Sequence, residues 1–148
     1  MNEMLENTRR SKPVLVLDFD GVCHSYKSGW KGVAVCPDPP VPGLFRFLSK
    51  AMEVFEVHIF SSRSSEKQGR EAMASWFMKA YETWLNEPPG KERTQRVFAF
   101  IRDLHFPEHK PPAHLSVDDR CVCFTGRWPR VIDLVNFQPW RQRKEKEG

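Results

Sequence analysis

Short apolar runs alternate with longer amphipathic segments along the first half of the chain. Residues 14–17 are four consecutive apolar residues, which predicts a strand that is covered on both faces. Residues 54–60 are rich in β-branched and aromatic side chains and predict a second strand. Between these runs, apolar residues recur at the spacing of one helix face and predict a helix that begins near Pro42; they are Leu44, Phe47, Leu48 and Ala51.

The second half of the chain continues the same alternation. A long helix is predicted over residues 66–85, because six apolar residues fall on one of its faces and form a core-facing stripe: Met73, Trp76, Phe77, Ala80, Tyr81 and Trp84. The apolar run "VFAFI" at residues 97–101 predicts a third strand. A fourth strand is predicted near residues 114–117, and residues 128–135 form a fifth strand or a terminal helix.

Strands that alternate with helices predict an α/β fold with parallel strands and right-handed crossovers. We expect a three-layer α/β/α sandwich, built on a Rossmann-like parallel sheet of about five strands. The 148 residues suit a single domain, residues 1–148, with a core over about 12–137 and flexible basic termini.

Composition and charge indicate in which compartment the protein is expected and which partners it could bind. No apolar stretch has the length of a membrane span, and the polar first twelve residues lack the apolar segment of a secretory signal, so we expect a soluble, cytoplasmic protein with no membrane partner. The net charge is +4, of which residues 1–12 carry +1 and residues 141–148 carry +2. These basic termini are interpreted as solvated ends; the alternative is an electrostatic contact with nucleic acid.

Polar residues follow three of the predicted strands, and the three clusters are Asp18 with Asp20, Ser61 with Ser62, and Asp118 with Asp119. The carboxyl ends of parallel strands share one edge of a sheet, where ligands bind in open α/β sheets. Four carboxylates at one edge repel one another unless a cation lies among them. Carboxylate oxygens suit Mg²⁺, so the sequence predicts a magnesium site for phosphoryl transfer.

Four segments in this order also resemble a known family. "DFDGV", "VHIFSSR", "HKPPA" with Lys110, and "LSVDDR" are similar to the four motifs of the haloacid dehalogenase (HAD) superfamily. They extend over residues 14–120, which is most of the chain. The proline-rich insertion after the first strand is too short for a helical cap domain. The resemblance therefore implies a capless, Mg²⁺-dependent phosphatase that hydrolyses phosphomonoesters through an aspartyl-phosphate intermediate.

The resemblance also implies roles for individual residues. Asp18 is the expected nucleophile, and Asp20 is the expected general acid, which then acts as the base that activates water. Lys110 is expected to neutralise charge between the phosphate and Asp18. Ser61 is expected to bind a phosphoryl oxygen, with Ser62 as the alternative.

Metal and further substrate contacts complete the expected site. Asp119 is expected to hold Mg²⁺ together with the Asp18 carboxylate and the Asp20 backbone carbonyl, and Asp118 binds the metal directly or through water. Arg63 is expected to contact substrate. Taken singly, each of these residues also fits a structural role, such as a turn, a helix cap or a surface ion pair.

The expected substrate is phosphorylated, and because the site is open, it can be a macromolecule. "VDDR" and the extra arginines resemble the phosphatase domains of polynucleotide kinase/phosphatases, which remove 3′-phosphates from nucleic-acid ends. The alternative from another class is a phosphate-binding regulatory module with little turnover. The oligomeric state is not predicted.

Overall fold

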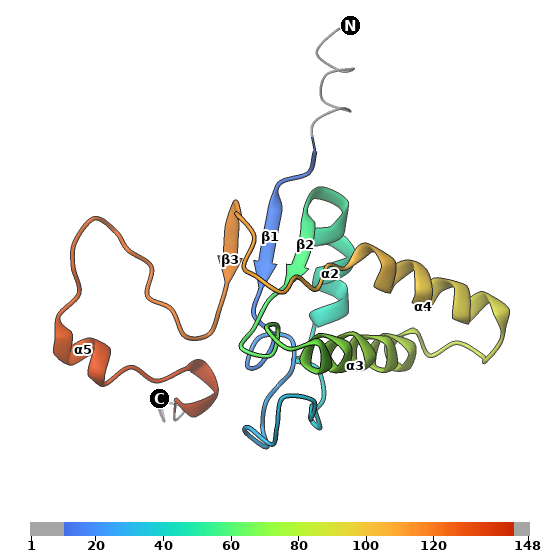
Figure 1. The fold of residues 1–148 in the computed structure, drawn as a ribbon, viewed down its shortest axis with the longest axis horizontal. Helices are drawn as coiled ribbons and strands as arrows, with labels where there is room; N and C mark the ends of the chain where they lie inside the picture. Colours follow the sequence, from blue (N-terminus) through green and yellow to red (C-terminus); the bar gives the residue numbers. More distant parts are fainter. Residues whose placement is uncertain (1–10, 144–148) are drawn as a thin grey trace, which may run out of the picture.

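The computed structural model describes residues 11–143 and has an α/β fold built around one small parallel sheet (Figure 1). Its elements, in chain order, are β1 (Val14–Leu17), α2 (Leu44–Val54), β2 (Glu56–Ile59), α3 (Lys67–Leu85), α4 (Lys91–Asp103), β3 (Leu115–Val117), α5 (Val131–Val135) and the 3₁₀ helix η1 (Trp140–Gln142).

The sheet has three parallel strands in the order β2-β1-β3, so β1 is the central strand. Leu17, the last residue of β1, is paired with Ile59 in β2 and with Val117 in β3. All three strands therefore end at the same level, and the polar residues that follow them meet at one edge of the sheet. This confirms the predicted positions of the first, second and fourth strands.

The prediction of about five strands is wrong. Residues 97–101 lie inside α4, and the terminal segment forms α5 rather than a strand. A short apolar run fits a strand or a helix, and here the helical period decides, because Val97 is buried with Phe100 and Ile101 packed near the core, whereas Phe98 is exposed. Among the described residues, the sheet is extended beyond β2 by His105 alone, whose backbone pairs with Val57 and Ile59.

The three-layer arrangement is also not found. Alternate residues of β1 and β2, including Leu15, Leu17, Val57 and Ile59, point to the face that α2 and α3 cover and form the core with them. Within residues 11–143, α5 has no buried residue, so it does not form a second helical layer on the sheet. In Figure 1, α2, α3 and α4 lie on the β2 side of the sheet, whereas α5 lies beyond β3.

The aromatic stripe predicted on α3 packs against the turn that follows β1. Met73, Trp76 and Phe77 are buried, whereas Trp84 at the far end of the helix is exposed. Phe19 is fully buried and meets the Trp76 ring edge-on at a centroid distance of 5.1 Å. Aromatic pairs of this kind fix the position of the loops that carry them. The stripe therefore holds the segment between Asp18 and Asp20 against the core.

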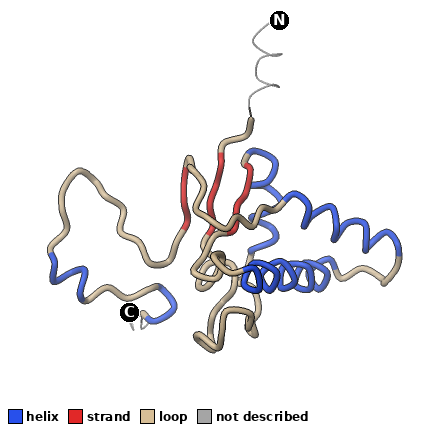
Figure 2. The backbone as a smooth tube through the Cα atoms, viewed as in Figure 1, coloured by secondary structure: helices blue, strands red, loops and turns tan. Residues whose placement is uncertain are grey.

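The chain after β3 leaves the sheet as a long irregular loop and returns through η1 to the turn after β1 (Figure 2). Residues 141–143 belong to the predicted basic terminus and are part of this return, whereas residues 1–10 and 144–148 lie outside the described residues. No helix among residues 11–143 is both long enough and apolar enough to cross a membrane.

Candidate functional site

A tight turn follows β1 and directs the side chains of Asp18 and Asp20 away from the core, toward a cavity at the edge of the sheet. The amides of Val22, Cys23 and His24 all donate hydrogen bonds to the carbonyl of Phe19, at 3.2, 2.9 and 2.9 Å. Phe19 points into the core, while Asp18 and Asp20 on either side of it line a cavity at the edge of the sheet. The alternation of side chains in "DFD" thus anchors the turn and presents both carboxylates.

Three carboxylates converge at this edge. Oxygen atoms of Asp18, Asp118 and Asp119 all lie within 4.8 Å of one another. The two strand ends are joined here, because the Asp18 amide donates to the Val117 carbonyl at 2.9 Å. Asp119 lies directly over Gly21, where an added Cβ would be 2.2 Å from Oδ2 and where φ is +82°. Only glycine satisfies both the space and the backbone angle at that position.

The three carboxylates perturb one another strongly. The pKa of Asp18 is raised to about 8, first by burial and then by the charges of Asp118 and Asp119, and a hydrogen bond from the Phe19 amide opposes the shift. Such a cluster keeps a proton or takes a cation. Its ligands are all carboxylate oxygens, which is the donor type that Mg²⁺ and Ca²⁺ bind and that softer metals bind less well. The described residues therefore fit the expected magnesium ion.

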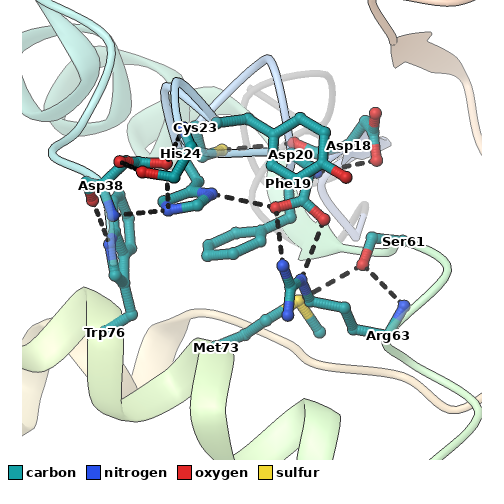
Figure 3. A network of polar contacts seen from close by, with 12 residues as sticks. Asp18, Phe19, Asp20, Cys23, His24, Asp38, Ser61, Arg63, Met73 and Trp76 are labelled. Atoms are coloured by element: carbon teal, nitrogen blue, oxygen red, sulfur yellow. Dashed lines mark hydrogen bonds and ion pairs between the residues drawn. The ribbon is translucent and has the colours of Figure 1, made fainter. Parts of the chain in front are cut away.

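Asp20 belongs to a different set of contacts (Figure 3). Arg63 binds its carboxylate through two nitrogens, with Nε 2.9 Å from Oδ2 and Nη2 3.2 Å from Oδ1. His24 Nδ1 lies 2.9 Å from Oδ1. Burial alone would raise the pKa of Asp20, but the hydrogen bonds from His24 and Arg63 and the charge of Arg63 outweigh it and lower the pKa. Asp20 is therefore held as a carboxylate.

His24 is a site residue to which the sequence assigned no role. It is fully buried and stacks on Phe19, with the ring planes 4° from parallel. Its Nε2 accepts the backbone N–H of Asp38 at 3.0 Å, so Nε2 carries no proton. Nδ1 consequently carries the hydrogen and donates it to Asp20. The only sequence signal was the position of His24 four residues after Asp20.

Arg63 is fully buried, and its guanidinium contacts protein acceptors on two loops. Besides Asp20, it donates from Nη1 to the carbonyls of Gly32 and Val33, at 2.7 and 2.9 Å. The guanidinium carbon also lies 4.6 Å from the centre of the Trp30 ring. These contacts tie the proline-rich loop to the acidic turn. The Arg63 guanidinium therefore binds protein groups, whereas the sequence predicted that it contacts substrate.

The two predicted serines lie in different surroundings. Ser61 is buried, accepts the Arg63 amide at 3.0 Å and donates toward Met73 Sδ at 3.5 Å. Ser62 is exposed and lines the same cavity as Asp18 and Asp20. The geometry therefore favours Ser62, the alternative, as the hydroxyl that faces a ligand.

Lys110 is not brought to the carboxylates. It is exposed in the loop that precedes β3, and within residues 11–143 no hydrogen bond or ion pair joins it to Asp18 or to the other acidic residues. It is also not among the residues that line the site cavity. The structure therefore gives Lys110 no contact that matches its predicted role.

The cavity at the sheet edge has a volume of about 150 Å³ and is lined by Asp18, Asp20, Tyr26, Trp30, Ser62, Asp119 and Arg120. That volume has room for a phosphoryl group and a cation. A larger cavity of about 720 Å³ lies between the proline-rich loop and α3 and does not include these carboxylates.

The C-terminal return supports this site from outside. Trp140 Nε1 donates to the Gly21 carbonyl at 2.7 Å, and the Arg141 guanidinium carbon lies 4.6 Å from the centre of the Tyr26 ring. Tyr26 has a φ of 58°, an unusual angle for a side chain of its size. Contacts from a segment more than a hundred residues away therefore help to hold the wall of the cavity.

A second polar cluster lies on the sheet face opposite the helices. Both His58 Nε2 and His105 Nε2 approach Glu56 Oε1, at 3.1 and 3.4 Å. The two imidazole rings are stacked at 4.5 Å with their planes 12° apart. A metal binds in the plane of an imidazole, and two stacked parallel planes do not share such a point. This cluster is therefore a His58–Glu56 hydrogen bond with the His105 ring stacked beside it, where the His105 backbone pairs with β2, and not a metal site in this arrangement.

Comparisons with known proteins add no family assignment. No protein-family model, no curated protein and no solved structure matches the chain.

Proposed function

We propose that this protein is a Mg²⁺-dependent phosphomonoester hydrolase that forms an intermediate on Asp18. The observation that carries the proposal is the convergence of Asp18, Asp118 and Asp119 at the carboxyl edge of β1 and β3. The ordered motifs that resemble the HAD superfamily support it independently of the geometry. The proposal concerns the chemistry of the site and does not depend on a five-stranded sheet.

The proposed metal ligands are the carboxylates of Asp18 and Asp119, with Asp118 as a direct ligand or one acting through water. When bound, Mg²⁺ would offset part of the negative charge of the three carboxylates and of the phosphoryl oxygens. Asp118 Oδ1 accepts the Arg120 amide at 2.8 Å, which orients its carboxylate. That contact leaves Oδ2 of Asp118 for a ligand or a water molecule.

The proposed reaction has two displacement steps. An Asp18 carboxylate oxygen attacks phosphorus in line, a new O–P bond forms, and the bond from phosphorus to the ester oxygen breaks; the departing oxygen takes a proton from Asp20. Water then attacks the phosphorus of the aspartyl phosphate and transfers a proton to Asp20, and the Asp18–phosphorus bond breaks to release inorganic phosphate. Ser62 is the proposed hydroxyl that donates to a phosphoryl oxygen.

The contacts of Asp20 support its role in the second step. Three donor atoms, on His24 and Arg63, hold its carboxylate in the ionised form and in one orientation. A carboxylate that is ionised and fixed is ready to accept a proton from water. The acid role in the first step requires that Asp20 carry a proton against these donors, so the geometry supports the base role more directly.

Hydrolysis of a panel of phosphomonoesters, with and without Mg²⁺, tests the proposal. We expect phosphate release that needs Mg²⁺ and is lost in Asp18→Asn, because the amide removes the nucleophile with almost no change of shape. Asp133→Asn is a matched control, since Asp133 is an exposed carboxylate in α5 that pairs with Arg130. Thermal unfolding of both variants checks that the fold is intact.

Undiminished hydrolysis by a folded Asp18→Asn protein would overturn the proposal. Tight binding of a phosphate analogue without hydrolysis of any ester on the panel would also overturn it, and would indicate a phosphate-binding regulatory module instead.

A further inference from the structure

The size of the site cavity separates what is bound inside it from what is bound at its rim. With a volume of about 150 Å³, it has room for a phosphoryl group and a cation, and the remainder of a substrate would extend toward the solvent-exposed lining residues. Whatever distinguishes one substrate from another is therefore recognised by the residues at the opening. Of the lining residues, Trp30, Ser62 and Arg120 are exposed to solvent, and Trp30 and Arg120 carry the large side chains among them.

Trp30 is the exposed aromatic residue among the residues that line the site. About half of it, 51%, remains accessible to solvent. Trp84, Trp128 and Trp140 are exposed to a similar or greater extent, so what distinguishes Trp30 is its place among the residues that line the acidic cavity. An exposed aromatic side chain beside a phosphate-sized cavity is therefore a candidate contact for ligand.

The indole of Trp30 is supported from one side. The guanidinium carbon of Arg63 lies 4.6 Å from its ring centre, and Arg63 is itself fixed by Asp20 and by the carbonyls of Gly32 and Val33. A buried cation that is held by four hydrogen bonds is a rigid support for a ring. One face of the indole is thus occupied by protein, and the exposed half of its surface faces outward.

We propose that Trp30 is a stacking platform for a planar ring of the substrate, so that the substrates of this site are nucleoside phosphates. This inference rests on the proposed phosphatase function and names its substrate class. Nucleobases stack on exposed aromatic rings with about 1–3 kcal/mol per base, in a sequence-tolerant way. Arg120 at the same rim supplies a guanidinium for a neighbouring phosphate or a base edge.

The test compares substrates with and without a base. The value of kcat/KM is measured for a nucleoside 3′-monophosphate and for ribose 5-phosphate, with wild type, Trp30→Ala, Trp30→Phe and the control Trp128→Ala. Trp128 is a suitable control because it is 87% exposed and lies outside the cavity. We expect Trp30→Ala to lower kcat/KM for the nucleotide by about 5- to 150-fold, the range that corresponds to the stacking free energy, with little change for ribose 5-phosphate.

The other arms distinguish stacking from a structural role and identify the source of the ring. Trp30→Phe retains a ring over Arg63 and is expected to recover most of the nucleotide activity. A 3′-phosphorylated oligonucleotide in the same series separates a nucleic-acid end from a free nucleotide, and both support the proposal if they depend on Trp30. Equal losses for the nucleotide and for ribose 5-phosphate in Trp30→Ala would overturn it, as would a Trp30 dependence confined to 4-nitrophenyl phosphate.

A binding measurement keeps this inference distinct from the phosphatase proposal. Quenching of tryptophan fluorescence by adenosine 3′-monophosphate is recorded for wild type and Trp30→Phe, with Mg²⁺ present. Quenching that depends on Trp30, without hydrolysis of any ester, would refute the phosphatase function and uphold stacking. Hydrolysis without any preference for bases, and without quenching, would uphold the phosphatase and refute stacking.

Discussion

Replacing Arg63 with methionine is the strongest stability test of the contacts that build the site. The guanidinium is fully buried and makes four hydrogen bonds, two to Asp20 and two to backbone carbonyls of the proline-rich loop. Methionine fills similar space but donates nothing. It leaves a largely buried carboxylate with His24 as its remaining side-chain partner and leaves the carbonyls of Gly32 and Val33 without these donors.

The expected cost follows from those losses. Removing one partner of a buried ion pair typically lowers the free energy of unfolding by about 3–5 kcal/mol, because the remaining charge stays uncompensated. That is a large share of the roughly 5–15 kcal/mol that stabilises a domain. At a urea m-value of about 2 kcal/mol/M, the midpoint of unfolding falls by about 2 M.

Urea unfolding followed by circular dichroism measures this change, and the chain contains a matched control. Arg130 binds Asp133 with a similar two-nitrogen geometry, Nε to Oδ2 and Nη2 to Oδ1 both at 2.9 Å, but its side chain is 79% exposed. For such an exposed pair, Arg130→Met is expected to cost no more than about 1 kcal/mol.

Two results would refute this reasoning. The first is an Arg63→Met protein that unfolds at the wild-type midpoint, and the second is a loss equal to that of Arg130→Met. The double variant Arg63→Met with Asp20→Asn sharpens the test, because removing the uncompensated charge should restore part of the lost stability. A double variant less stable than Arg63→Met would show that the carboxylate is not the source of the cost.

Two further predictions concern His24 and the metal site. His24→Leu should lower kcat/KM by about 10- to 100-fold, because it removes a hydrogen bond to the Asp20 carboxylate. His24→Asn should lose less activity, since its amide can donate from the Nδ1 position. Equal losses in steady-state assays would contradict the role of His24 in positioning Asp20. Because burial and neighbouring charges raise the pKa of Asp18 from 3.8 to about 8, the metal-free protein should lose stability as the pH rises from about 4 to about 8. Below that raised pKa, Mg²⁺ must displace the proton of Asp18 in order to bind. Its affinity, measured by calorimetry, should therefore rise by up to about tenfold per pH unit from pH 6 to 8, and an affinity that is constant over this range would refute the pKa assignment.

Local sequence patterns were sufficient for the elements whose period is unambiguous. The strand at residues 14–17 and the helix over residues 66–85 lie where the periodicity placed them, within a residue at either end. The run at residues 97–101 was misassigned, because four or five apolar residues fit either period and only packing of Val97, Phe100 and Ile101 on one helix face selects the helix. The number of strands in the sheet was overestimated for the same reason.

The candidate site also has one part that could be predicted from the sequence and one part that could not. The cluster of Asp18 with Asp118 and Asp119 was predictable, since acids that directly follow parallel strands share one edge of a sheet. The partners of Asp20 were harder to predict from the sequence, because Arg63 is separated from it by 43 residues. The Asp38 backbone likewise contacts His24 only because a long loop folds back toward it. The same path places Trp30 at the rim of the cavity.

The sequence by itself determined where strands end and which acidic residues stand at those ends, because side-chain alternation and apolar runs are properties of neighbouring residues. The tertiary structure decided which charges face one another: three carboxylates around a space for a cation, and a fourth taken by a buried arginine and a buried histidine. Those pairings depend on the paths of the loops and on desolvation of the charged groups. Both arise only in the folded chain, because distant segments must pack together before they exclude water from a charged group.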